Sequence, residues 1–342
     1  MPPAAPSATQ DRDRREDRDR LGTSAVPSRD TRDVSDFIRR GNEGPSRRID
    51  DIRRERQELR QDDRTVIREP GRTIIQQGDR TIIRHNEIDR FAIRARDVRT
   101  ERRDGRTVTI VERPNGVRII TVTDEEGRLL RRVRRERDRE IVIIDNDYDY
   151  RGPRRPSAFF VDIPPPVVRI PRERYILDAG AAGPDDVYEV LTAPPVMELE
   201  RHYTLDQVRY TQPLRERMPR VDLDINFDSG SWQLTPDQLD RLAVIADAIN
   251  RAIERNPREV FLIEGHTDAV GAEIDNLSLS DRRAEAVAVA LTEQFHVPAE
   301  NLVTQGYGEQ HLKVPTQEDE RANRRVAVRR ITPLLEQAGA PR

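Results

Sequence analysis

The chain of 342 residues contains no cysteine, one lysine and one tryptophan, and aromatic residues make up only 4% of it. The absence of cysteine excludes disulfides, thiolate metal sites, a cysteine nucleophile and a lipid-modified N-terminal cysteine. No stretch approaches the roughly 18 apolar residues that a membrane-spanning helix needs. The opening MPPAAPSATQDRDRREDRDR lacks the apolar core of a secretory signal, so we expect any export signal to lie upstream of Met1.

Charged residues make up 36% of the chain and hydrophobic residues 35%, which is too polar for a single packed unit of this length. The basic residues are almost all arginine, and acids nearly balance them to a net charge of -3. After residue 220 the acids outnumber the bases. This argues against a nucleic-acid partner there, because phosphate binding needs clustered cations.

The first 150 residues divide into two segments of different composition. Residues 1–60, with DRDRREDRDR, hold too few apolar groups to offset chain entropy and are predicted to be a disordered charged tether. Residues 61–150 contain β-branched runs broken by glycine turns, as in RTVIREPGRTIIQQGDRTIIRH, which predicts a β-rich meander of hairpins. Arginine often falls on the opposite face of a strand from isoleucine and valine. One face of the sheet should therefore be exposed to solvent, and the apolar face must be covered by another part of the protein or by the same face of a second copy.

Residues 151–220 contain a Pro-Pro-Pro triplet and several further prolines, a density that forbids long helices and central strands. We predict a proline-rich connector that drapes over a neighbouring domain. Short elements are expected only near residues 185–191 and 205–210.

Residues 221–332 show the pattern of a complete small domain, followed by a C-terminal tail at 333–342. VDLDINFD alternates like a strand, and the next helix has the capping-box residues Thr235 and Gln238. VFLI is typical of a strand buried on both faces. A second helix with Ser280 as its N-cap, a strand in NLVTQGYGE, a short helix and the strand RRVAVRRI follow. This order predicts an α+β fold, a βαβαβ-type mixed sheet with helices on one face.

The loop in FLIEGHTDAVG follows a predicted strand, where ligands collect in open α/β sheets. A hydrolase would need an oriented base beside its nucleophile, but the motif offers only Thr267 without a glycine elbow. A metal site would need further ligands, and His296 and His311 lack a recognisable ligand spacing. We therefore predict that His266 packs or caps the turn, and that the chain is not an enzyme and takes no metal or cofactor.

Asp268 on this loop and the pair Arg282-Arg283 are the remaining charged candidates, with the arginines expected in the first turn of the next helix. Neighbours on a helix point about 100° apart, so one arginine can face solvent while the other reaches toward Asp268. One interpretation is a plain Asp268–Arg283 salt bridge, which would stabilise by about 0–1 kcal/mol if exposed. The other is a clamp for a zwitterion. Gly265 and Gly271 are predicted to be turn glycines.

GHTDAVG, then Asn276 before LSDRRAEAV, then NLVTQGYGE and ANRRV, resemble a known family. It is the peptidoglycan-binding domain shared by the C-terminal half of outer membrane protein A, the peptidoglycan-associated lipoprotein and the flagellar stator protein B. The resemblance covers about residues 221–332, with the four motifs in the family's order. It implies non-covalent capture of the diaminopimelate in the peptide stem of peptidoglycan.

The resemblance also implies roles for single residues. The family's acid falls on Asp268, which would hold the ligand's ammonium group, and the family's arginine falls on Arg283, which would grip a carboxylate. Asn276 takes the place of the family's asparagine, and Thr267 and Arg324 are implied pocket neighbours.

One departure from the family is Asp275, which stands where an aromatic residue is common and leaves the shape of that pocket wall open. The resemblance predicts a periplasmic or outer-membrane-associated protein that anchors the outer membrane or an envelope assembly to the cell wall. The arginine-rich meander would meet the outer-membrane surface or an envelope protein. The alternative is an envelope scaffold whose β-rich region binds a protein partner, while the C-terminal domain only localises it.

Overall fold

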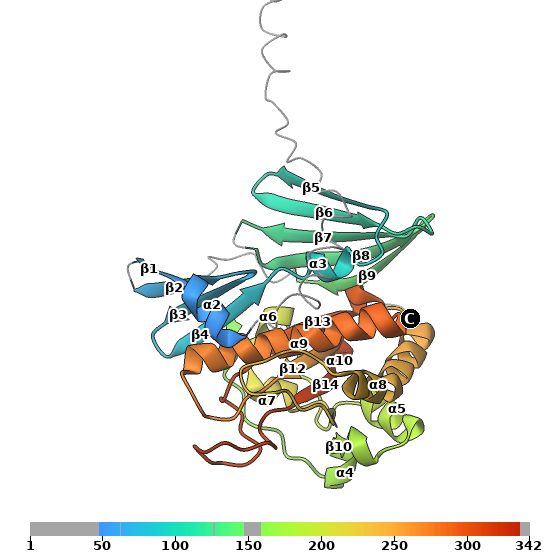
Figure 1. The fold of residues 1–342 in the computed structure, drawn as a ribbon. Coiled ribbons are helices and arrows are strands. Elements are labelled where there is room, and N and C mark those ends of the chain that lie inside the picture. The colour runs from blue at the N-terminus through green and yellow to red at the C-terminus, as the bar shows by residue number, and fades with distance from the viewer. Residues whose placement is uncertain (1–47, 62, 126, 147–158, 336–342) are drawn as a thin grey trace, which may run out of the picture.

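The computed structural model describes residues 48–61, 63–125, 127–146 and 159–335, which form three β-sheets with helices around them (Figure 1). Two antiparallel sheets come from the N-terminal half, and a mixed sheet comes from the C-terminal half. Within these residues no helix combines the length and the apolar character needed to cross a bilayer.

The N-terminal half folds as hairpins in series, as its alternating β-branched runs predict. Its elements are α2 (Ile49–Glu55), β1 (Gln57–Gln61), β2 (Arg64–Glu69), β3 (Arg72–Gln77), β4 (Arg80–His85), α3 (Ile88–Phe91), β5 (Asp97–Arg103), β6 (Arg106–Glu112), β7 (Arg118–Asp124), β8 (Leu129–Glu136) and β9 (Arg139–Asp145). Strands β1 to β4 form the first sheet and strands β5 to β9 the second, each in sequence order. Every neighbouring pair is antiparallel, so each sheet is a meander.

Helix α2 lies inside the segment that the sequence assigns to a disordered tether. Residues 1–47 of that segment fall outside the described residues, but Ile49 and Ile52 of α2 are buried against Leu279 and Trp232. The predicted boundary at residue 60 is therefore too late. The two isoleucines make a stripe too narrow to signal a helix, and their apolar partners come from far along the chain.

The C-terminal half forms the third sheet. Its elements are α4 (Arg172–Tyr175), β10 (Ile176–Asp178), η3 (Ala179–Ala181), α5 (Pro184–Thr192), α6 (Leu205–Tyr210), α7 (Gln212–Arg215), β11 (Arg220–Leu223), α8 (Pro236–Arg255), β12 (Phe261–Gly265), α9 (Glu273–Phe295), η4 (Ala299–Asn301), β13 (Leu302–Gly306), β14 (Val326–Arg330) and α10 (Thr332–Leu335). The strand order is β10-β11-β14-β12-β13. The outer pairs β10/β11 and β12/β13 are parallel and the two inner pairs antiparallel. The predicted α+β class with a mixed sheet is confirmed.

Both faces of the third sheet are buried. Phe261 and Ile263 of β12 pack into a core with the long helices α8 and α9 and the shorter helix α5 on one face. Leu262 points to the other face, where it joins a cluster with α6, α7, α10 and strands β8 and β9. The continuous apolar run in VFLI therefore reflects a strand covered on both sides, as expected.

Two elements of the third sheet's core come from the predicted connector. Strand β10 adds an edge strand beside β11, and α5 buries Val187, Val190 and Leu191 against the sheet. The short elements expected near residues 185–191 and 205–210 are α5 and α6.

The helix ends show where local signals suffice. Helix α8 begins after Thr235, whose backbone N–H donates to Gln238 Oε1 at 2.8 Å, so the predicted capping box is present. Helix α9 instead begins at Glu273, and Ser280 lies within it rather than at its N-cap. The Ser280 hydroxyl donates to Leu277 O and accepts from the Gly308 N–H.

The predicted short helix between β13 and β14 is wrong, since the fully described stretch 307–325 forms turns and coil.

The apolar faces of the N-terminal sheets are covered by the C-terminal half of the same chain. Ile67, Ile74 and Ile83 of the first sheet pack on Leu277 of α9. The second sheet packs through α3 onto η4, and through β8 and β9 onto the third sheet. The cover that the alternating pattern requires is thus intramolecular, and Figure 1 shows the first sheet lying along α9.

Candidate ligand-binding site

Two glycines let α9 cross directly over the ends of β12 and β13. A Cβ on Gly265 would lie 1.9 Å from Ser280 O, and a Cβ on Gly306 would lie 2.3 Å from the backbone nitrogen of Asp281. Gly265 is therefore a close-approach glycine and not the predicted turn glycine. Gly271 does sit in a turn, with φ at +106°. This packing places the loop after β12 beside the first half of α9.

Asp268 lies in this loop and is paired with an arginine other than the expected one. Its Oδ2 lies 2.5 Å from Nη1 of Arg324, which also contacts Asp319, and its Oδ1 accepts from the Val270 N–H. Among the described residues no ion pair joins Asp268 to Arg283. The plain Asp268–Arg283 salt bridge is therefore not formed.

Arg283 is almost fully buried, with 1% of its surface exposed. Its Nε donates to Ser231 O at 2.9 Å, its Nη2 donates to Asp228 O at 3.0 Å, and its guanidinium lies over the Phe227 ring. The remaining nitrogen, Nη1, is buried and has no hydrogen-bond partner within the described part of the chain.

The charge of Arg283 persists in this environment. Burial lowers the pKa of Arg283 to about 10, with a further lowering by Arg324 and an opposing effect of Asp268. The three groups are therefore within electrostatic reach of one another, and at neutral pH the buried guanidinium stays charged.

The position of Arg283 in α9 differs from the prediction. Because the helix begins at Glu273, Arg283 lies in its third turn, about 15 Å along the axis from the first residue. The amides of the helix N-terminus therefore cannot share a ligand group with it. Arg282 does not face solvent either. It is buried. Its Nη2 lies 3.4 Å from Glu69 Oε2 and donates to Pro70 O at 3.1 Å.

Asn276 and Thr267 tie the loop to its surroundings. Asn276 Nδ2 donates to Val270 O at 3.2 Å and to Glu309 Oε2 at 2.6 Å. The Thr267 N–H donates to Gly308 O at 3.0 Å, while its hydroxyl is buried with no hydrogen-bond partner in the regions described. The structure thus brings Asp268 and Arg324 into direct contact and places Asn276 and Thr267 in the same loop framework.

His266 is a packing residue. Its ring stacks on Tyr307 with centroids 5.6 Å apart, and neither ring nitrogen has a hydrogen-bond partner among the residues described. Burial and the nearby Arg325 hold its pKa well below the usual value, so the imidazole is neutral. The described ranges contain no cluster of three or more histidine or acidic side chains that could hold a metal.

Asp275, the departure from the family pattern, has partners that the sequence does not reveal. Its carboxylate lies 2.6 Å from Arg53 Nη2 and 2.8 Å from Arg56 Nη2, both from the N-terminal segment. The acid at a position where the family commonly has an aromatic residue was the one signal in the sequence that residue 275 makes different contacts here.

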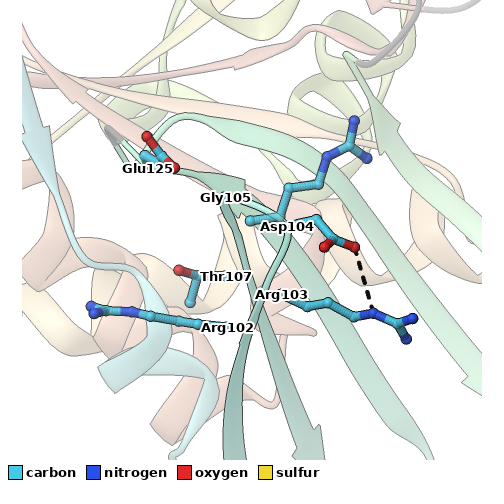
Figure 2. A pocket seen from close by; sticks show the side chains of 7 residues that line it. Arg102, Arg103, Asp104, Gly105, Thr107 and Glu125 are labelled. Atoms are coloured by element: carbon cyan, nitrogen blue, oxygen red, sulfur yellow. Dashed lines mark ion pairs between the residues drawn. The ribbon is translucent and has the colours of Figure 1, made fainter. Parts of the chain in front are cut away.

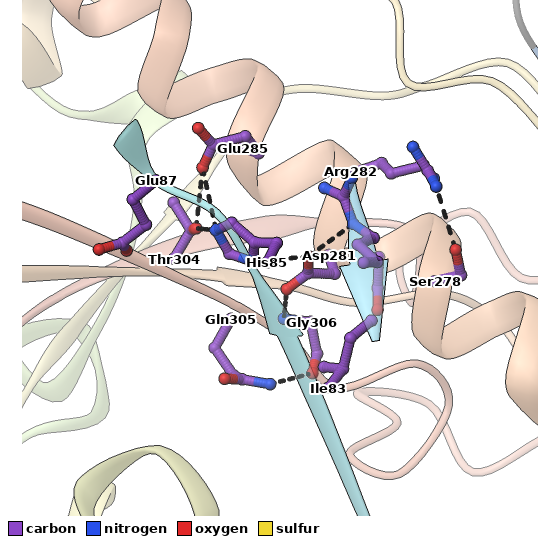
Figure 3. A network of polar contacts seen from close by, with 12 residues as sticks. Ile83, His85, Glu87, Ser278, Asp281, Arg282, Glu285, Thr304, Gln305 and Gly306 are labelled. Carbon is purple, nitrogen blue, oxygen red and sulfur yellow. Dashed lines mark hydrogen bonds and ion pairs between the residues drawn. The ribbon is translucent and has the colours of Figure 1, made fainter. Parts of the chain in front are cut away.

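A second polar cluster lies where β4 meets α9 (Figure 3). His85 Nδ1 lies 3.0 Å from Asp281 Oδ2, and His85 Nε2 lies 2.9 Å from the Thr304 hydroxyl and 3.3 Å from Glu285 Oε2. Burial alone would lower the pKa of His85, but the two carboxylates reverse this and raise it to about 9. Arg72 also binds Asp281. These contacts fix the first sheet to the helix that carries Arg283.

A shallow pocket at the tip of the β5–β6 hairpin gathers three arginines (Figure 2). Its lining residues are Arg102, Arg103, Asp104, Gly105, Arg106, Thr107 and Glu125. Arg103 Nε lies 3.5 Å from Asp104 Oδ2, and both side chains are exposed. Solvated pairs of this kind are common on surfaces and do not indicate a built site.

Residues 226–325 match the OmpA family model. The chain is 30% identical over 124 residues to outer membrane porin F of Pseudomonas aeruginosa, a match that covers 36% of this chain and 33% of the porin. It is 32% identical over 111 residues to the lipoprotein YfiB of Escherichia coli, covering 32% of this chain and 67% of the lipoprotein. The chain thus spans about a third of the length of the first curated relatives that it matches.

Among solved structures, the peptidoglycan-associated lipoprotein from Burkholderia pseudomallei is 23% identical, with 31% of this chain and 86% of that chain covered. The TM-score for this pair is 0.27. The sequence matches confirm the family that the four motifs predict. The chain belongs to the OmpA family, through a domain that spans residues 226–325.

Proposed function

We propose that residues 221–332 bind peptidoglycan without covalent chemistry and anchor the outer membrane or an envelope assembly to the cell wall. The proposal is supported by the OmpA family match and by relatives named as an outer membrane porin and a lipoprotein. The same relatives support a place in the periplasm or at the outer membrane. Asp268, Asn276, Thr267, Arg283 and Arg324 are the proposed ligand residues.

The observation that supports the ligand chemistry is the buried Nη1 of Arg283, which has no hydrogen-bond partner in the described part of the chain and lies within the electrostatic influence of Asp268. Nη1 of this charged guanidinium is enclosed, so a ligand carboxylate reaches it only when the surrounding side chains move aside. The two hydrogen bonds of the other nitrogens hold the guanidinium in place, so the carboxylate then meets a donor that loses little freedom. Asp268 keeps 11% of its side chain exposed and can take an ammonium group, with Arg324 at its rim. An acid and two arginines suit the zwitterionic end of diaminopimelate.

Lysine-type peptidoglycan tests this chemistry, because it keeps the ammonium group and lacks the carboxylate at that end. Leaving Arg283 without its carboxylate should weaken binding by about 2–5 kcal/mol, or roughly 30-fold to several thousand-fold. The measurement is cosedimentation of the full chain with diaminopimelate-type and lysine-type sacculi. Equal binding to both would refute the diaminopimelate assignment, and binding to neither would refute the peptidoglycan assignment.

Asp268→Ala probes the other end of the clamp. The variant should lose affinity for diaminopimelate-type sacculi through the missing partner for the ammonium group. Asp319→Ala is the matched control, since it removes the other acid that contacts Arg324. If the two variants bound equally, Asp268 would have no special role.

The scaffold alternative draws less support from the structure. The apolar faces of both N-terminal sheets pack inside the chain, so a protein partner would have to meet their arginine-rich outer faces or edges. A fragment of the N-terminal half that captured an envelope protein without the C-terminal half would favour that alternative.

A further inference from the structure

The turn at residues 228–231 is held from two sides. On one side, Arg283 donates to the carbonyl oxygens at its two ends, at 2.9 and 3.0 Å. On the other side, Arg48 Nη2 and the Ile49 N–H donate to the carbonyl oxygens of its two middle residues, at 2.6 and 2.9 Å. All four carbonyl oxygens of the turn thus have donors, and two of these donors belong to the start of α2.

Helix α2 is docked beside this turn by apolar contacts. Ile52 is fully buried and Ile49 nearly so, and both pack with Leu279 of α9 and with Trp232, the only tryptophan in the chain. Trp232 directly follows the turn. Its ring also lies 5.1 Å from the guanidinium of Arg282, so the packing of α2 reaches the helix that carries the candidate site.

Ionic contacts hold the other end of the segment. Arg53 and Arg56 both bind Asp275, whose side chain is 8% exposed, and Arg56 Nη2 also lies 2.6 Å from Glu69 Oε1. Asp275 directly precedes the proposed ligand residue Asn276. The segment 48–56 therefore contacts the framework of the site at the turn and at the first turns of α9.

We propose that residues 48–56, the α2 strap, are positioning residues for the peptidoglycan site, an inference that rests on the proposed function. The strap keeps the 228–231 turn in one conformation, and the turn's carbonyl oxygens keep Arg283 in one orientation. When the strap is released, the turn and the guanidinium gain alternative conformations. Ordering them again then opposes ligand binding, so affinity falls although the strap touches no ligand atom.

Ile52→Asp in the full chain tests the strap, because it places a charge at a fully buried position of α2 only. Trp232 emission reports release of the strap through a red shift, and hydrogen–deuterium exchange of residues 226–235 reports mobility of the turn without any ligand. Binding is measured by cosedimentation with diaminopimelate-type sacculi. Residues that act on a site without touching its ligand typically change affinity by about 2- to 30-fold, so we expect a loss in this range.

Two variants serve as controls. Ile52→Val keeps an apolar branched side chain, so its Trp232 emission, its exchange of residues 226–235 and its sacculus binding should match those of the wild type. Leu59→Asp introduces the same charge at an exposed apolar position of β1 and should leave all three unchanged. If Ile52→Asp fails to fold, Ile52→Ser gives a milder release.

The outcomes separate this inference from the proposed function. Red-shifted emission with unchanged exchange of the turn, or with unchanged or stronger binding, would overturn the positioning role. If the wild-type chain does not bind sacculi, the proposed function is overturned. The exchange of the turn then still decides whether the strap holds it.

Discussion

Replacing Arg283 with alanine should cost both stability and binding, and its neighbour Arg282 allows the two effects to be separated. Arg283 donates two charge-assisted hydrogen bonds to the backbone carbonyl groups of Asp228 and Ser231. Bonds of this kind contribute about 1.5–3 kcal/mol each. The two bonds together give a loss of about 3–6 kcal/mol in the free energy of unfolding of Arg283→Ala, which shifts the melting temperature down by roughly 5–10 °C.

Arg282→Ala is the matched control because Arg282 is buried on the same helix but points to the first sheet. Its partner Glu69 keeps a bond to Arg56 at 2.6 Å, so we expect a smaller loss of stability, about 1–2 kcal/mol. Only the Arg283 variant should lose peptidoglycan binding, by roughly 30-fold or more.

The assay is thermal denaturation followed by circular dichroism, with cosedimentation measured at a temperature where every variant is folded. If Arg283→Ala melted like the wild type, the two carbonyl bonds would contribute nothing and the buried geometry would be wrong. If both variants lost binding equally, the loss would reflect general destabilisation of α9 and not a ligand contact.

Three further predictions concern the packing around the site. The pKa of His85 is raised from 6.5 to about 9 in the folded chain. Protonated His85 therefore adds roughly 3 kcal/mol to the free energy of unfolding below pH 6.5, and this contribution disappears as the pH rises to about 9. The stability difference between wild type and His85→Asn, measured by urea unfolding, should shrink over that range, and a difference independent of pH would contradict this. Gly306→Ala should destabilise the fold by more than about 2 kcal/mol, because the added Cβ would lie 2.3 Å from the backbone nitrogen of Asp281. If this variant unfolded at the same urea concentration as the wild type, the close approach would be disproved. A fragment of residues 172–342 should unfold at a higher urea concentration than one of residues 215–342, since only the longer one contains β10 and α5, and equal midpoints would show that these elements add no stability.

The sequence determined those features whose signals act over a few neighbouring residues. Thr235 and Gln238 set the start of α8 because a capping box involves only four consecutive residues. Alternating β-branched runs and glycine turns determined the hairpins of both N-terminal sheets, since register and face follow from a period of two. The four motifs identified the family, and they do so without any knowledge of contacts.

Local patterns failed where a partner from elsewhere in the chain decided the outcome. Ser280 has the right side chain for an N-cap, yet α9 begins at Glu273 because the first sheet covers its opening turns through Leu277. Ile49 and Ile52 form too narrow a stripe to predict a helix, and their burial depends on Trp232 and α9.

Only the tertiary structure could decide which charges meet. With 60 basic and 63 acidic residues, nearly every arginine has many possible acidic partners, and the sequence carries no rule that ranks them. Asp268 binds Arg324 and not Arg283, and Asp275 binds two arginines more than 200 positions away. Coulomb attraction between solvated charges is weak and unselective, so pairing follows from where apolar burial and backbone packing place the side chains.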